Sequence, residues 1–422
     1  MSLVKKDLKD SIRHFTPAWF AVNMGVGIIS TLFANFPYGS TTAPMKALSA
    51  VVFFLNLLLF VAFCAASTAR YVLFPDLWRL MINHPVQSLY LGCFPMGAAT
   101  LINVSVTLFY SEYGFGGSAF LYTLWGFWWL DVAVSALCCW GLVHVMSVVH
   151  DQSLSRMTAI WLLPVVTLIV ASSTGGILAQ ALHPLSEQKA LITLTFSIFL
   201  VAIGLSLALM ILTIYLFRLI VHGPHPGASV VSSFVPLGPM GQAGFSIVLI
   251  GDAMRTFLPV HGNHSLFLSS AQVGEIVYAV CMCIAFVLWA LATMWLVYAL
   301  LGIQAVVRKS RFPFRVPFWG MIFPNGVYAN LTISLYRTFD VRFFRVWGAI
   351  YAGITFAMWL VVSVITVSMV YHGVIFVAPC LEEIDMARDF VPEEKRAAEA
   401  RVKAAEEEAA QSTAVAPGQC GL

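Results

Sequence analysis

The stretch FPNGVYANLTI (residues 323–333) is part of an apolar run that a proline and a glycine interrupt near its start. Four other runs are interrupted in the same way: TPAWFAVNMG (16–25), FPMGAATLINV (94–104), LPVVTLIVASS (163–173) and GPMGQAGFSIV (238–248). An unbroken run of ~20 apolar residues spans a bilayer, whereas a broken run leaves backbone groups that lipid cannot satisfy. We therefore expect the broken runs to lie where protein or a water-filled path covers them.

Ten apolar runs fill residues 18 to 377, and broken and unbroken runs alternate. They cover roughly 18–36, 43–69, 86–110, 119–149, 158–182, 189–219, 238–258, 271–306, 320–339 and 346–377. The prolines at 17, 95, 164, 239 and 324 recur at intervals of about one helical hairpin. The sequence thus predicts an all-α membrane protein of ten transmembrane helices in five hairpins. The odd spans should line something, and the even spans should face lipid.

Composition supports this class. The 422 residues are 60% hydrophobic and 10% charged, with a mean hydropathy of +0.86, which excludes a soluble globular domain. We predict a cytoplasmic segment at 1–17, a transport domain at 18–377 and a charged cytoplasmic tail at 378–422 that is helical or disordered. One side of the membrane then holds 17 Lys and Arg and the other side six, so both termini should be cytoplasmic. The glycosylation sequon at Asn263 falls in a predicted outside loop and agrees with this orientation.

Small or polar residues recur one to two turns after the breaks. They are Asn23, Gly25, Asn103, Ser172 and Asn330, with Gln242 in a fourth unit that departs from the spacing. Small polar residues often hold helices together in membranes. Their repetition in five units favours a second role, the lining of a path.

Few ionisable residues lie inside the spans, and such residues are functional candidates. Asp131 has no helical partner at three or four positions, so it is a candidate for proton coupling or for a structural charge. Asp252 and Arg255 are three residues apart on one helix and are expected to neutralise each other.

The sequence contains no metal-binding, phosphate-loop or nucleophile motif. We therefore expect no catalytic residue, metal, cofactor or nucleic-acid partner, and no pump driven by its own ATP hydrolysis. A membrane enzyme or receptor, the alternative of another class, would not need five broken helices at a regular period.

Phe323 precedes the helix-breaking Pro324, as Phe94 precedes Pro95. A bulky ring beside a kink can plug a narrow path, and a change of rotamer would open it. Simple core packing explains the same position equally well.

The segments RHFTPAWFAVNMGVGI (13–28) and FWGMIFPNGVYANL (318–331) resemble the tellurite-resistance/dicarboxylate transporter family, and the likeness extends over about residues 11–377. The resemblance implies a pseudo-fivefold arrangement in which the odd helices form an inner ring around a central pore. It also implies a homotrimer of separately conducting subunits in the plasma membrane, with Phe323 as the gate of each pore.

The activity that the resemblance implies is efflux of sulfite or bisulfite, and the alternative is transport of a dicarboxylate such as malate. Amides and hydroxyls would replace water around the anion without a fixed counter-charge. The residues that we expect to line this path are Asn23, Asn103, Ser172, Gln242, Asn325 and Asn330. A dicarboxylate would favour a basic residue in the pore. Because Arg255 is the only basic residue well inside an odd span, the sequence favours the smaller anion. We further predict that the membrane potential drives export; Asp131 would be the coupling site of a proton-driven alternative.

Overall fold

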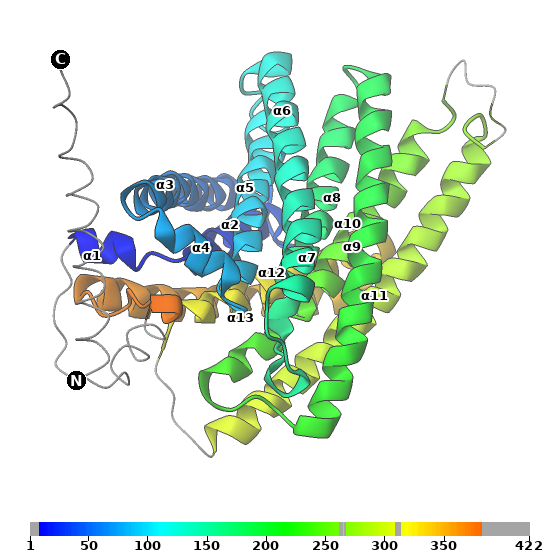
Figure 1. The fold of residues 1–422 in the computed structure, drawn as a ribbon. Coiled ribbons are helices and arrows are strands. Elements are labelled where there is room, and N and C mark those ends of the chain that lie inside the picture. Colours follow the sequence, from blue (N-terminus) through cyan, green and yellow to red (C-terminus); the bar gives the residue numbers. More distant parts are fainter. Residues whose placement is uncertain (1–7, 261–264, 266, 309–313, 382–422) are drawn as a thin grey trace, which may run out of the picture. The chain divides into compact units, whose positions relative to one another are not determined.

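The computed structural model describes residues 8–260, 265, 267–308 and 314–381, and every regular element in that part of the chain is a helix (Figure 1). The sequon at Asn263 and the predicted tail beyond residue 381 lie outside the described residues. The chain divides into two units, residues 1–376 and 377–422.

Five helices, which we call the inner helices, correspond to the broken runs. They are α2 (Phe20–Asn35), α5 (Cys93–Val104), α8 (Leu163–Leu182), α10 (Leu237–Phe257) and α12 (Ile322–Phe339). Five outer helices follow them in turn: α3 (Ala43–Leu73), α6 (Gly117–Ala136), α9 (Glu187–His222), α11 (Ala271–Val307) and α13 (Arg342–Tyr371). Each inner helix packs on the outer helix that follows it, which gives the five predicted hairpins.

The second hairpin contains two π-helical segments. The inner helix α5 continues into η3 (Ser105–Tyr110), and the outer helix α6 continues through η4 (Leu137–Gly141) into α7 (Leu142–Val148). Three short segments complete the helices: α1 (Leu8–Arg13), α4 (Asp76–Asn83) and η5 (Leu154–Arg156).

The inner helices contact one another in a closed order. Helix α2 packs on α5, α5 on α8, α8 on α10 and α10 on α12, and α12 returns to α2. Between 78 and 94% of the residues in the first four inner spans are buried, against 22–33% in the outer spans. The expectation that protein covers the broken spans and that the unbroken spans face outward is therefore confirmed.

Nine spans in the described part of the chain are long and apolar enough to cross a membrane, whereas ten were predicted. The predicted span 320–339 exists as α12, but Asn325, Asn330 and Arg337 make it too polar to qualify. Residues 322–335 of this helix are all buried. Because other helices enclose it, α12 does not need an apolar surface.

A short 3₁₀ segment leads into each inner helix, and this segment is the physical form of the predicted break. The segments are η1 (Pro17–Trp19), η2 (Ser88–Gly92), η6 (Ala159–Leu162), η7 (Gly227–Phe234) and η8 (Val316–Met321). They contact one another in the same closed order as the helices that they precede. Pro17 lies within its 3₁₀ segment, whereas the other four anchoring prolines lie at the second or third residue of the α-helix. The first unit is therefore out of register with the other four.

Buried basic residues tie three of these entry segments to the ends of their hairpins. Arg70, at the end of α3, donates to the carbonyl of Phe15, just before η1. Arg218, near the end of α9, donates to the carbonyl of Ser155, before η6, at 3.0 Å. In the second hairpin, Nε2 of His150 lies 2.9 Å from the carbonyl oxygen of Ile82, before η2. From the sequence, these residues were expected only to lie on the cytoplasmic side.

Two glycines let the inner helices approach closely. A Cβ atom at Gly326 of α12 would lie 2.4 Å from Cγ1 of Ile28 on α2. A Cβ atom at Gly27 would lie 2.0 Å from Oγ1 of Thr100 on α5. Since real Cβ atoms do not approach this closely, glycine is required at both helix crossings.

Candidate functional site

A cavity of about 350 Å³ lies among the five inner helices, and all five contribute to its wall. The residues that line it are Ile28, Thr31, Asn35, Thr100, Asn103, Thr107, Val170, Ile177, Gln180, Gln242, Phe245, Val248, Leu249, Asp252, Tyr278, Phe323, Asn330, Ser334, Arg337 and Thr338. More than half of these side chains are polar, which is unusual for the interior of a membrane protein.

The lining residues recur every three, four or seven positions, so each inner helix turns one face to the cavity. The number of residues between a lining residue and the start of its helix indicates how far along the helix it lies. Asn35, Asp252 and Arg337 each come fifteen residues after the first residue of their helix, near its C-terminal end. Phe323 is the second residue of α12 and lies at the opposite end of the wall. At 1.5 Å per residue, Phe323 and Arg337 are separated by about 21 Å along the helix axis.

Three of the predicted path residues present amides to the cavity. Asn103 lines it from α5, and within the described residues its side-chain amide has no hydrogen-bond partner. Gln242 lines it from α10 and donates from Nε2 to the hydroxyl of Ser173. Asn330, on α12, accepts a 3.1 Å hydrogen bond at Oδ1 from Nδ2 of Asn35. The wall thus offers uncharged polar groups at the middle of the cavity.

The C-terminal end of the cavity carries charge. The guanidinium of Arg337 donates to Asn35 twice, to Oδ1 at 3.3 Å and to the backbone carbonyl at 3.1 Å. Asp252 lines the same cavity from the neighbouring helix α10. No ion pair joins these two side chains within the described part of the chain. A cation and a carboxylate therefore lie at the C-terminal end of the cavity wall, which we call the mouth, with no ion pair between them in the described part of the chain.

Phe323 and Phe94 precede equivalent prolines but have different surroundings. Phe323 is 3% exposed and lines the cavity. Phe94 packs among other rings, with its centroid 5.6 Å from that of Phe60 and 5.1 Å from that of Phe20. Only the first of the two rings stands on the cavity wall.

Four predicted path residues are not on this wall. Nδ2 of Asn23 donates to Oδ1 of Asn56 at 3.1 Å, and Nδ2 of Asn56 donates to Thr100 at 3.2 Å. Gly25 is a packing position, where a Cβ atom would lie 2.9 Å from the ring of Trp319. We assign both residues to helix packing. Asn23 and Asn330 each come six residues after the proline of their unit, which suggested equivalent positions. Because Pro17 lies in a 3₁₀ segment and Pro324 lies within α12, the two asparagines occupy different positions on their helices.

Ser172 and Asn325 also serve helix packing. The hydroxyl of Ser172 donates to the carbonyl of Ser197 at 2.6 Å and lies 2.6 Å from the hydroxyl of Ser246. Asn325 donates to the carbonyl of Met321 at 2.6 Å and accepts from the hydroxyl of Tyr351. Here the alternative role of small polar residues, that of holding helices together, prevails.

The three predicted ionisable candidates have different surroundings. Arg255 does not form an ion pair with Asp252 as expected; its Nε donates to Glu275 on α11 at 2.9 Å, and its guanidinium lies 4.9 Å from the ring centroid of Tyr278, which lines the cavity. The pairing was expected from helical spacing, but the neighbouring helix supplies a better-placed acid. Asp131 is 5% exposed on α6, and neither carboxylate oxygen has a hydrogen-bond partner within the described residues. It does not line the cavity.

Arg337 is the functional candidate that the sequence analysis missed. It was passed over because it sits in the last turn of its helix, where a basic residue commonly offsets the helix dipole. Asn35 was missed for a similar reason, as the last residue of α2. Asn35 and Arg337 each come fifteen residues after the first residue of their α-helix, and this relation can be recognised only when the helix starts are known.

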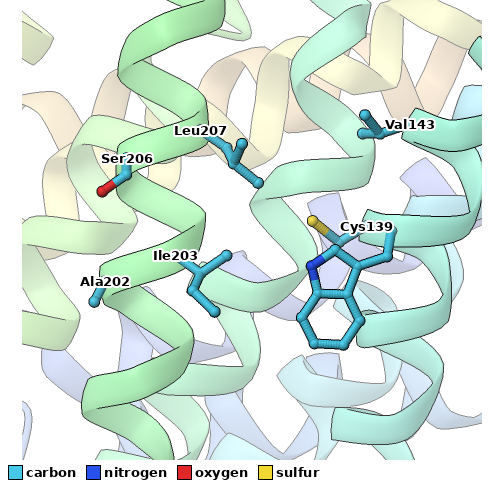
Figure 2. Close-up of a pocket in the computed structure, with 7 residues that line it drawn as sticks. Cys139, Val143, Ala202, Ile203, Ser206 and Leu207 are labelled. Atoms are coloured by element: carbon cyan, nitrogen blue, oxygen red, sulfur yellow. The ribbon is translucent and has the colours of Figure 1, made fainter. Parts of the chain in front are cut away.

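A second hollow, of about 550 Å³, lies on the outside of the helices (Figure 2). Ala202, Ile203, Ser206 and Leu207 on α9 face Cys139 and Val143 across it. Its wall is apolar and comes from outer helices alone, so it offers an anion almost no hydrogen-bond donors. The smaller inner cavity is the better candidate site.

The fold and the cavity together define a multi-pass helical membrane protein of the transport class, with a polar compartment enclosed by its inner helices. The chain belongs to the voltage-dependent anion channel family, whose sequence model matches residues 14–367. This confirms the family resemblance of the two quoted segments.

Characterised relatives share most of the chain. It is 35% identical to the sulfite efflux pump of Trichophyton rubrum over 86% of its own length and 92% of that protein. It is 28% identical to the sulfite efflux pump of Candida albicans, over 82% and 72% of the two chains. It is 21% identical to the malic acid transport protein of Schizosaccharomyces pombe, over 85% and 79%. The family and these relatives are named for the transport of anions.

Proposed function

We propose that this protein exports sulfite or bisulfite across the plasma membrane, through a path that includes the inner cavity of each subunit. The observation that carries the proposal is the cavity wall, to which all five inner helices contribute and which presents Asn103, Gln242 and Asn330. Similarity to two sulfite efflux pumps supports the choice of anion.

The geometry suits a small anion that must also be released. A fixed cation at mid-path would bind it too tightly, whereas amide and hydroxyl donors replace its water one contact at a time. The N-terminal ends of the five inner helices, with their 3₁₀ segments, gather at one end of the helices and carry the positive ends of the helix dipoles. They would attract the anion to that end, which is cytoplasmic in the proposed orientation. The closed order of inner helices is then a pseudo-fivefold ring around the path.

We assign the gate of this path to Phe323. Its ring stands at the end of the cavity wall nearest those helix N-termini, and its neighbour Pro324 removes a backbone donor at the first turn of α12. A rotamer change there would widen the path without moving a helix.

Export of a dicarboxylate such as malate is the second candidate. A dicarboxylate favours a basic residue in the path, and Arg337 on the cavity wall supplies one. A relative named as a malic acid transport protein agrees with this alternative.

Flux measurements in proteoliposomes separate the two candidates. Sulfite flux well above malate flux supports the proposal, and the reverse order replaces it with the second candidate. In the same vesicles, Phe323→Ala is expected to raise anion conductance, because it removes the ring that closes the path. Phe94→Ala is the matched control, since Phe94 also precedes a helix-breaking proline but packs against Phe60 and Phe20. Equal effects of the two variants would contradict the gate.

The assembly and orientation belong to the same proposal. We infer a homotrimer with a path in each subunit, and both termini in the cytoplasm. The outer helices support insertion in a bilayer, since at most a third of their residues are buried within the subunit. The 17-to-6 distribution of Lys and Arg supports the orientation.

A further inference from the structure

We propose that Arg337 and Asp252 set the charge of the anion that this protein carries, and this inference rests on the proposed anion path. Both side chains line the inner cavity, and both come fifteen residues after the start of neighbouring inner helices. They therefore both lie near the C-terminal ends of their helices, at the mouth.

Arg337 is held in place but keeps donors free. Its two hydrogen bonds to Asn35 fix the guanidinium plane, and Asn35 is itself fixed by its bond to Asn330. A guanidinium has five N–H donors, so most of them remain available to a ligand. The C-terminal ends of helices carry partial negative charge, which would repel an anion from this mouth. A fixed cation offsets that repulsion.

Asp252 limits what the cation attracts. It forms no ion pair within the described residues, because Arg255 on the same helix is occupied by Glu275. With both groups ionised, the mouth has no net side-chain charge, and a monoanion meets little barrier. A dianion gains twice the attraction of Arg337 but also meets twice the repulsion of Asp252. The pair therefore determines the preference between monoanions and dianions, such as bisulfite against sulfite.

Anions of fixed valence provide the test. The ratio of sulfate flux to nitrate flux is measured in proteoliposomes for the native protein, Arg337→Gln and Asp252→Asn. We expect Arg337→Gln to lower the ratio and Asp252→Asn to raise it, each by about tenfold, because a unit charge a few Å away in a water-filled mouth changes the energy of the second anion charge by that order. An unchanged ratio in either variant overturns the inference.

Matched controls isolate the cavity from general surface charge. Arg345→Gln removes a cation that donates to the carbonyl of Pro37 at 3.3 Å and stacks on Tyr38, at the same end of the helices but off the cavity wall. Glu112→Gln removes an acid that pairs with Lys46 off the cavity wall. Neither should change the ratio, and a change as large as that of the cavity variants overturns the inference.

Two further measurements keep the result decisive. Arg337→Lys retains the charge and should retain the ratio; if Arg337→Gln fails to fold, Arg337→Lys and Asp252→Asn decide the question. Sulfite flux of the native protein is measured in the same vesicles. If nitrate or sulfate moves but sulfite does not, the proposed function fails, whereas the ratios still test the role of the two charges.

Discussion

Replacing Asn23 by leucine should lower stability, whereas replacing Asn103 by leucine should lower anion flux, although the sequence predicted both amides on the anion path. Asn23 is fully buried and donates from Nδ2 to Oδ1 of Asn56 at 3.1 Å and to its backbone carbonyl at 3.3 Å. Asn103 lines the cavity and has no side-chain partner within the described residues. The first amide belongs to a helix contact, and the second faces the cavity.

The expected magnitudes follow from these contacts. Asn23→Leu leaves Oδ1 of Asn56 buried without a donor. An unsatisfied buried polar group costs about 1–3 kcal/mol of stability, and a hydrogen bond between membrane helices contributes about 0.6 kcal/mol. We therefore expect a loss of about 1–2 kcal/mol in stability. Asn103→Leu breaks no internal hydrogen bond, so its stability should stay within about 0.5 kcal/mol of the native protein. It does remove an amide donor to the anion, which is worth roughly tenfold or more in flux.

Two assays test the contrast. Thermal unfolding in detergent, followed by size-exclusion chromatography, should show a lower Tm for Asn23→Leu alone. Sulfite flux per folded protein should fall for Asn103→Leu alone. The double variant Asn23→Leu with Asn56→Leu should recover part of the lost stability, because both polar partners are then replaced. A native Tm with strongly reduced flux in Asn23→Leu would refute this reasoning, as would full flux in Asn103→Leu.

Three further predictions concern stability, energetics and orientation. Burial, together with the nearby charge of Arg218, lowers the pKa of His225 from 6.5 to about 4, so the unfolded chain binds more protons than the folded chain between these values. Stability should therefore be complete above pH 6.5 and decrease as the pH falls toward 4, and His225→Phe should flatten this decrease in Tm. Sulfite export should respond to an imposed membrane potential, which supplies about 2.3 kcal/mol per charge per 100 mV, and should continue without a pH gradient. Flux driven by a pH gradient alone, and lost in Asp131→Asn, would instead make Asp131 the coupling site. A tag at the C-terminus should resist protease added to intact cells, and its cleavage would reverse the proposed orientation.

The class of protein and the arrangement in five hairpins follow from the order of residues along the chain. Runs of about 20 apolar residues have no other stable environment than a bilayer or a protein interior, so their number and length fix the secondary structure. The prolines and glycines separated inner from outer helices correctly, because a broken helix must be covered. The polar residues of α12 did not obscure that assignment, since its break matched the other four.

Which polar residues face the cavity depends on how the helices pack, and the sequence pattern does not reveal it. Rotation about a helix axis changes by 100° per residue, so an error of a few positions moves a side chain from the wall to a helix contact. Pro17 lies in a 3₁₀ segment while Pro324 lies within its α-helix, and this difference separated Asn23 from Asn330. The pairing of Arg255 with Glu275, and the placement of Asp252 and Arg337 on one cavity wall, depend on neighbouring helices far apart in sequence. Local spacing contains no information about such neighbours, because they are set by the packing of the five hairpins.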